Sequence, residues 1–160
     1  MKITFIRHGQ TDFNKQGRLM GQEMDIPLNE VGTEQVENVD VSTLCDIDFI
    51  ISSPLRRATE TAEIINRKIN KEILFDDRLK EISYGSLAGK AWPEIEEITG
   101  DKDIHEKDIT ARYDYRLFGG ESIEDVKKRL LDFIAFVKVT YSDKNILVSA
   151  HGGVIEALES

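Results

Sequence analysis

The chain has 160 residues, of which 40 % are hydrophobic and 32 % charged, a balance typical of one soluble globular domain. Its net charge of −9 argues against nucleic acid and anionic membranes as partners, because both attract basic surfaces. Cys45 is the only cysteine, so an internal disulfide and a cluster of thiolate metal ligands are both excluded.

The N-terminal part of the chain predicts a strand followed by a helix. Residues 2–6 (KITFI) are short, apolar and rich in β-branched side chains, as buried strands are. The segment 29–40 has helical spacing, with Asn29 as its N-cap and Val36 and Val39 turned inward.

A second buried strand is predicted over 48–53, and it leads directly into a helix over 53–69. Ser53 is a favourable N-cap for this helix, and Pro54 suits its first position. An apolar stripe then follows at helical spacing, formed by Ala58, Ala62, Ile65 and Ile69.

The middle of the chain is less regular. Residues 72–75 predict a third short strand, and 92–99 predict a short helix that Gly100 closes. Residues 101–118 are polar and weakly patterned, so we expect a surface cap or loop there.

The C-terminal part contains the strongest helical pattern, over 121–141. It begins at Ser122, which forms a capping box with Asp125. A fourth strand over 145–150 and the start of a last helix follow. The apolar face of the long helix consists of Ile123, Val126, Leu130, Phe133, Ile134 and Val137.

Strands that alternate with helices predict a three-layer α/β fold, in which a largely parallel central sheet carries helices on both faces. In such sheets the ligand lies at the carboxyl ends of the strands. Three predicted strands end in residues suited to binding: 7–9 (RHG), 52–53 (SS) and 151–153 (HGG). We therefore expect two histidines and an arginine-bearing helix start at one edge of the sheet.

Neither membrane insertion nor export is predicted. No apolar run approaches the roughly 20 residues that span a bilayer. Met1-Lys2 leads directly into the first strand, without the basic start, long apolar stretch and cleavage site of a secretory leader. We therefore expect a cytoplasmic protein.

Four short motifs, taken together and in order, resemble the histidine phosphatase superfamily, the phosphoglycerate mutase-like group. The chain is most similar to its small-cap phosphatases, such as α-ribazole phosphatase and the broad-specificity phosphatases. The motifs are RHG at 7–9, SPLRRATETA at 53–62, LKEISYG at 79–85 and HGG at 151–153, and further similar segments are GRLMGQEMDIPLNEVGTEQ at 17–35 and GGES at 119–122.

The resemblance covers nearly the whole chain and has consequences for its organisation. It implies one domain over residues 1–160, with a short cap at about 82–120. It also implies a full helix and a further strand after His151, and the chain ends nine residues beyond that histidine. The C-terminal end is therefore short for the family.

The resemblance makes His8 the catalytic nucleophile. A neutral imidazole nitrogen can attack phosphorus without losing a proton, so this nucleophile needs no separate base. The other ring nitrogen would be oriented by a hydrogen bond, for which a backbone carbonyl near Gly9 is the expected acceptor. Glycine at position 9 lets the chain turn tightly beside the phosphate.

The other residues that match family positions would bind the transferred phosphoryl group. The charge of that group spreads over its equatorial oxygens, so cationic and neutral donors should surround it. Arginine is suited to this because its rigid fork binds two oxygens at once. The resemblance implies that Arg7, Arg57 and His151 are catalytic, and that Asn14, Gly21 and Gly152 complete the substrate-binding set with them, His8 and Glu81.

Glu81, in LKEISYG, matches the position of the general acid. Its carboxyl group would protonate the leaving oxygen and later help to deprotonate the attacking water. The resulting cycle is phosphohistidine formation followed by hydrolysis. It requires no metal and no cofactor, and no dense cluster of Asp and His residues suggests a metal site.

Several of these residues have simpler interpretations. Arg56 competes with Arg57 for the phosphate, and either could be a solvated helix residue. Asn14 could be a turn residue that bonds its own backbone, and Glu81 could be one surface glutamate among many. His105 is expected to be an exposed loop residue. Trp92 and Tyr84 are expected in the core or cap, with the substrate pocket as an alternative.

The predicted function is hydrolysis of a small phosphomonoester. The resemblance implies that mutases of the family carry a longer insertion between the general acid and the second histidine. Here Glu81 and His151 are only 70 positions apart, which implies a short cap and a phosphatase. Two alternatives remain: phosphoglycerate mutase-type phosphoryl transfer, and a phospho-ligand-binding or regulatory module with little turnover. If the sheet edge is open, a homodimer is possible.

Overall fold

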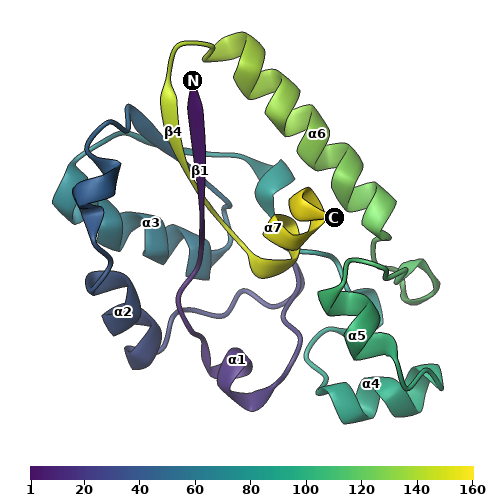
Figure 1. Cartoon of the computed structure of the whole chain (residues 1–160). Coiled ribbons are helices and arrows are strands. Elements are labelled where there is room, and N and C mark those ends of the chain that lie inside the picture. The colour runs from purple at the N-terminus through teal and green to yellow at the C-terminus, as the bar shows by residue number, and fades with distance from the viewer.

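The computed structural model describes residues 1–160 and has a parallel four-stranded sheet at its centre (Figure 1). The strand order is β1-β4-β2-β3, and every neighbouring pair is parallel. The last strand of the chain therefore lies inside the sheet, next to the first. The strands are β1 (Lys2–Arg7), β2 (Phe49–Ser52), β3 (Ile73–Phe75) and β4 (Asn145–Ala150).

Seven helices surround the sheet, and none is both long and apolar enough to cross a lipid bilayer. They are α1 (Asp12–Gln16), α2 (Glu30–Glu37), α3 (Arg56–Ile69), α4 (Trp92–Thr99), α5 (Ile104–Ile109), α6 (Ile123–Thr140) and α7 (Gly152–Glu159). Short 3₁₀ turns lie at Val41–Leu44, Asp77–Leu79, Gly85–Leu87 and Arg116–Phe118.

Alternating side chains of the central strands supply the two halves of the core. Phe49 and Ile51 of β2 pack in a cluster with α6 and α7, whereas Ile50 between them packs in a second cluster with α2 and α3. Figure 1 shows α2 and α3 on one side of the sheet and α6 on the other. The predicted three-layer α/β fold, with helices on both faces of a parallel sheet, is confirmed.

The long helix α6 begins as the sequence indicates. Asp125 N–H donates to Ser122 Oγ at 3.3 Å, and Ser122 N–H donates to Asp125 Oδ2 at 2.9 Å, which completes the capping box. The predicted apolar face is buried at Ile123, Val126, Leu130, Phe133 and Val137, and Ile134 is half-buried at its edge.

The start of the helix predicted over 53–69 was wrong. Helix α3 begins at Arg56 rather than at residue 53, and its N-cap is Leu55. Ser53 continues the strand instead, because its N–H donates to Ser149 O of β4 at 2.9 Å. Its hydroxyl group is bonded to a histidine of the pocket described below and does not cap the helix.

Of the two alternatives for 101–118, a surface cap or a loop, the irregular loop was wrong, because this segment contains α5 and a 3₁₀ turn. Ile104 and Asp108, one helical turn apart, are both buried. A helix of six residues has too few positions to show a periodic pattern, so only tertiary packing defines it.

We predict that the substitution Phe133→Ala lowers the free energy of unfolding by about 3–5 kcal/mol, because Phe133 is fully buried between α6 and the sheet. Urea unfolding followed by circular dichroism measures the change. The control is Val139→Ala on the same helix, where the side chain is 84 % exposed and the cost should stay within about 0.5 kcal/mol. Equal losses in the two variants would contradict this placement of α6.

Candidate active site

A pocket of about 250 Å³ lies at the carboxyl ends of β1 and β4, as the sequence predicts for a parallel sheet. Seven of the eight residues assigned to the site from the sequence line this pocket, namely Arg7, His8, Asn14, Gly21, Arg57, Glu81 and Gly152. The eighth, His151, is fully buried next to His8, and the centres of the two rings are 5.3 Å apart.

One nitrogen of His8 is held by the backbone. Nδ1 lies 2.7 Å from the carbonyl oxygen of Gly9, and a carbonyl only accepts hydrogen bonds, so Nδ1 carries the proton. Burial, reinforced by Arg57 and Arg7, lowers the pKa of His8 to about 3. The imidazole is therefore neutral at physiological pH, and its Nε2 retains a free lone pair.

The turn after His8 needs glycine for close packing. A Cβ atom on Gly9 would lie 2.5 Å from the carbonyl oxygen of Gly32, the backbone of α2. The N–H of Gly9 donates to Thr61 Oγ1 at 3.2 Å, and Thr61 in turn donates to Arg57 O at 2.8 Å. The turn that carries the histidine is thus anchored to α3.

Arg57 is the arginine of the pair that faces the pocket. Its side chain is fully buried and donates to Gly21 O at 2.9 Å and to Met24 O at 3.0 Å, while its Nε has no partner. Burial lowers the pKa of Arg57, and Glu81 opposes this effect. Arg56 lies outside, in an exposed ion pair with Glu60 at 2.7 Å.

His151 has one satisfied and one unsatisfied ring nitrogen. Its Nε2 lies 2.8 Å from Ser53 Oγ, and its buried Nδ1 has no partner. Burial, with help from Arg57, holds the pKa of His151 well below its ordinary value, so this ring is also neutral. Ser53 Oγ already accepts from Leu55 N–H at 3.3 Å.

Two buried nitrogen atoms beside His8 therefore lack hydrogen-bond partners: Arg57 Nε and His151 Nδ1. Each unpaired buried polar group costs about 1–3 kcal/mol, so a fold seldom retains such groups without a function.

Arg7 and Gly152 lie next to each other in the lining of the pocket. Arg7 is exposed and its guanidinium makes no ion pair within the chain. A Cβ on Gly152 would lie 3.1–3.3 Å from three atoms of that guanidinium. Glycine at this position therefore leaves room for the arginine over the N-terminus of α7.

Asn14 belongs to α1, a short helix that the sequence analysis did not predict. Its side-chain oxygen accepts from Thr11 N–H at 3.0 Å, and its own N–H donates to Thr11 Oγ1 at 3.2 Å, which forms a capping box. The alternative interpretation of Asn14 as a turn residue that bonds nearby backbone therefore holds for its side-chain oxygen. Its side-chain amide nitrogen remains a donor in a residue that lines the pocket.

Gly21 has a positive φ of 59°, and its carbonyl oxygen receives one of the hydrogen bonds from Arg57. Any side chain here would be strained and would also collide with the chain at Ile82 O, 2.7 Å from an added Cβ. Gly21 thus helps to orient the Arg57 side chain through its backbone.

Glu81 extends into the pocket from the loop after β3. Its Oε1 accepts from Ile82 N–H at 3.0 Å, and its Oε2 from Gly153 N–H at 3.4 Å. The second bond comes from the first turn of α7, where backbone donors stabilise a carboxylate. The glutamate is therefore held near both histidines.

Of the far wall of the pocket, only Trp92 was considered from the sequence, with the pocket as an alternative to core or cap, and it does line the pocket. Asp108 lies there with Glu156, and the exposed His105 stacks on Trp92 with ring centres 4.4 Å apart. His105 is exposed as expected, although it lies on a helix and not in a loop. No local pattern marks these residues, because α5, α4 and α7 meet only in the folded protein.

Asp108 is the most perturbed carboxyl group of this wall. Its Oδ1 accepts from Tyr115 OH at 2.7 Å and from Tyr84 OH at 3.2 Å. Burial raises the pKa of Asp108 to about 7, and the nearby Glu81 contributes in the same direction. Tyr84, whose place in core or pocket was open, is buried and also lines the pocket.

A neutral histidine with a free lone pair, surrounded by arginine and histidine donors at the edge of a parallel sheet, defines a phosphoryl-transfer site. Comparison with known proteins agrees. The family model described as histidine phosphatase superfamily (branch 1) matches residues 3–160. The chain belongs to the histidine phosphatase superfamily.

Relatives include phosphatases and mutase-like proteins. The chain is 35 % identical over 158 residues to an uncharacterized phosphatase, PhoE, of Bacillus subtilis, covering 98 % of this chain and 74 % of that protein. It is 31 % identical over 163 residues to a probable phosphoglycerate mutase, GpmB, of Salmonella choleraesuis, covering all of this chain and 74 % of that protein. These relatives confirm the prediction that the chain belongs with the phosphatases and mutase-like proteins of this family.

Solved structures show the same fold. YhfR of Bacillus stearothermophilus superposes with a TM-score of 0.86 at 28 % identity, covering 98 % of this chain and 77 % of that one. A mycobacterial glucosyl-3-phosphoglycerate phosphatase in complex with VO3 superposes with a TM-score of 0.84 at 30 % identity, covering 97 % and 78 %.

We predict that Asp108 makes the protein less stable as the pH rises. The raised pKa of the folded state means that its stabilising contribution is complete below the unfolded pKa of about 4 and is lost as the pH rises through about 7. The Asp108→Asn variant should lack this part of the pH dependence. The free energy of urea unfolding should therefore differ less between pH 5 and pH 8 in the variant than in the wild type. Asp103→Asn, an exposed aspartate before the same helix, is the control and should behave as the wild type. An unchanged slope in Asp108→Asn would refute the assignment.

Proposed function

We propose that this protein hydrolyses small phosphomonoesters through a phosphohistidine formed at His8, without a metal or cofactor. The observation that carries the proposal is the pair of unpaired buried nitrogen atoms, Arg57 Nε and His151 Nδ1, beside a histidine whose Nε2 is free to attack. A phosphoryl group against His8 would accept from both donors.

In the first step His8 Nε2 attacks phosphorus, a bond from this nitrogen to phosphorus forms, and the bond from phosphorus to the ester oxygen breaks. Glu81 transfers its proton to the departing oxygen, so that an alcohol leaves and not an alkoxide. Arg7, Arg57 and His151 donate hydrogen bonds to the equatorial oxygens, whose negative charge is then partly neutralised.

In the second step water attacks the phosphohistidine. Glu81, now ionised, accepts a proton from the water, and the bond from nitrogen to phosphorus breaks. Inorganic phosphate leaves and His8 returns to its neutral form. Asn14, Gly21 and Gly152 complete the binding site, the first as a neutral donor and the glycines by leaving space around the arginines.

A short cap supports hydrolysis over mutase chemistry. Residues 82–120, which include α4 and α5, form the proposed cap of a domain that spans residues 1–160. Such a small cap leaves the phosphohistidine accessible to water, whereas a mutase must exclude it. The likeness to GpmB keeps phosphoglycerate mutase-type transfer as the second candidate.

The site also bears on the substrate and the surroundings of the protein. A small metabolite fits a pocket of about 250 Å³ better than a macromolecule does.

We further propose a cytoplasmic location, on the basis of the single cysteine. Dimer formation through the open edge strand β1 is also proposed, and light scattering on the purified protein tests it.

We predict that His8→Ala lowers the hydrolysis of p-nitrophenyl phosphate at least about 100-fold, a loss of about 2.7 kcal/mol in transition-state stabilisation. The wild type should remain active in excess EDTA and should form an acid-labile, base-stable phosphoprotein during turnover. Circular dichroism confirms that the variant is folded. More than about one tenth of the wild-type rate in His8→Ala would exclude this nucleophile.

We also predict a contrast between the two neighbouring arginines. Arg57→Ala should lower kcat/KM about 10²- to 10³-fold, because it removes a buried donor to the phosphoryl group. Arg56→Ala, whose side chain is exposed and bonded to Glu60, should leave kcat/KM within about twofold. Similar losses in the two variants, both folded by circular dichroism, would overturn the assignment.

A further inference from the structure

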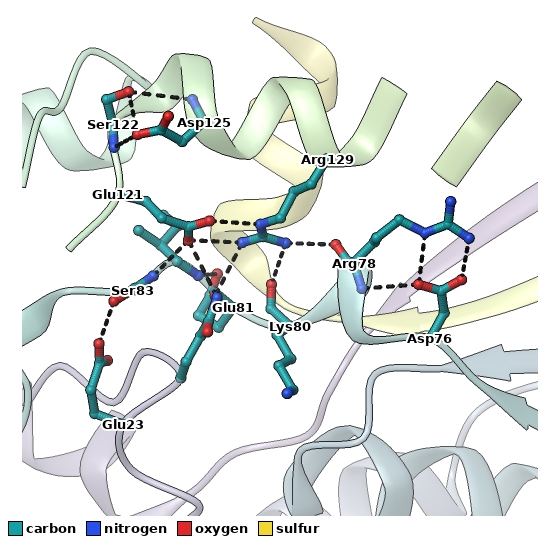
Figure 2. A network of polar contacts seen from close by, with 12 residues as sticks. Glu23, Asp76, Arg78, Lys80, Glu81, Ser83, Glu121, Ser122, Asp125 and Arg129 are labelled. Atoms are coloured by element: carbon teal, nitrogen blue, oxygen red, sulfur yellow. Dashed lines mark hydrogen bonds and ion pairs between the residues drawn. The ribbon is translucent and has the colours of Figure 1, made fainter. Parts of the chain in front are cut away.

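Arg129 does not line the pocket, yet it is bonded to the backbone that carries Glu81 (Figure 2). Its Nη1 donates to the carbonyl oxygens of Arg78 at 2.6 Å and Lys80 at 2.7 Å. Its Nη2 donates to the carbonyl oxygen of Glu81 itself at 3.2 Å. One guanidinium thus binds three carbonyl groups of the loop that leads to the general acid.

Glu121 extends this contact to the other side of Glu81. Its carboxylate pairs with Arg129 through Nε at 2.8 Å and Nη2 at 3.0 Å, the two-point geometry in which the pair is strongest. The same carboxylate accepts from Ser83 N–H at 2.9 Å and from Gln22 Nε2 at 3.3 Å. The loop is therefore held both before and after Glu81.

The pair is built on a rigid element and is largely shielded from water. The side chains of Arg129 and Glu121 are only 16 % and 20 % exposed. Glu121 directly precedes the Ser122 cap of α6, and Arg129 follows it on the same helix, next to the fully buried Leu130. Any shift of this pair would require α6 to move against the core.

A nearby arginine forms a second, similarly shielded ion pair that does not contact Glu81. Arg78 binds Asp76 at 2.6 Å and Asp132 at 2.8 Å, and neither bond reaches the backbone of Glu81. Figure 2 shows the two guanidiniums on either side of the chain segment that leads to Lys80. The Arg78 side chain is therefore a matched control for Arg129.

We propose that Arg129, together with Glu121, is a positioning residue that aims the Glu81 carboxyl group at the leaving oxygen of the substrate. The inference rests on the proposed function, in which Glu81 is the general acid. Arg129 acts through Glu81 and touches no substrate atom.

Substrates with different leaving groups distinguish a residue that positions the acid from a residue that only supports the fold. An alkoxide is a poor leaving group and needs a proton as it departs, whereas p-nitrophenolate is a stable anion and needs none. A misplaced acid therefore slows the hydrolysis of an alkyl phosphate far more than that of p-nitrophenyl phosphate. A loosened fold slows both alike.

The experiment measures kcat on glycerol 3-phosphate and on p-nitrophenyl phosphate for the wild type, Arg129→Met, Arg78→Met and Glu81→Gln. We expect Arg129→Met to lose at least about tenfold more on the alkyl ester than on the aryl ester, in the same sense as Glu81→Gln. Arg78→Met should lose equally little on both. The double variant Glu81→Gln/Arg129→Met should lose scarcely more than Glu81→Gln alone, because both changes remove one function.

Each other outcome has a defined meaning. Equal losses on the two substrates in Arg129→Met, or additive losses in the double variant, overturn the inference while Glu81 keeps its role. An absence of selectivity in Glu81→Gln itself removes the general acid, and the inference with it. If Arg129→Met does not fold, Glu121→Gln provides the test, because it keeps the shape and one acceptor oxygen. The same selective loss is then expected, and equal losses contradict the proposal.

Discussion

The site depends on the in-register parallel pairing of β1 with β4. Arg7 lies opposite Ala150, and the backbone N–H of His8 donates to the carbonyl oxygen of Ala150 at 3.1 Å. This ladder ends both strands at one level, so His8 and His151, near opposite ends of the sequence, emerge side by side. A shift of one residue would turn one of the two histidines to the other face of the sheet. His8, His151 and the helix N-terminus at Gly152 would then no longer converge.

Burial determines the protonation state of the two histidines. In water their pKa would lie near neutrality. At the sheet edge, desolvation and the adjacent Arg57 favour the neutral forms of both histidines, as the proposed roles of His8 and His151 require. The same arginine that is proposed to bind the phosphoryl group therefore also keeps the histidines uncharged. Although the chain has a net charge of −9, three arginines, Arg7, Arg18 and Arg57, line the pocket.

Helix α6 connects the core to the chemistry. One face packs Phe133 and Leu130 against the sheet, while Arg129, on the edge of that face, holds the loop of Glu81. The most strongly predicted helix of the chain therefore supports the least regular part of the site. Glu121, just before this helix, also accepts a hydrogen bond from Gln22, the residue after Gly21 of the pocket. The loop of Glu81 and the segment of Gly21 therefore share one anchor.

Local pattern was enough for the elements whose residues are close in sequence. The α6 capping box and the Asn29 cap were predicted because their hydrogen-bond partners lie three residues apart. The strands were predicted from their short apolar runs, although their partners lie on distant strands. Six of the eight site residues were predicted from four motifs in order, and Asn14 and Gly21 from further positions that resemble the family. The structure brings all eight together. The true start of α3, the helix α5, the Asp108 wall and the Arg129 contacts were not predictable, because each depends on partners distant in the chain. Ser53 serves β4 and His151 rather than its own helix, and α5 is stabilised by two tyrosines from other segments. The sequence by itself determined the order of elements and the chemical types at the strand ends. Only the tertiary structure decided which buried nitrogen atoms lack partners, and that Arg129 is the arginine that holds the loop of Glu81. The reason is that burial and hydrogen bonding between remote segments arise only when the layers pack.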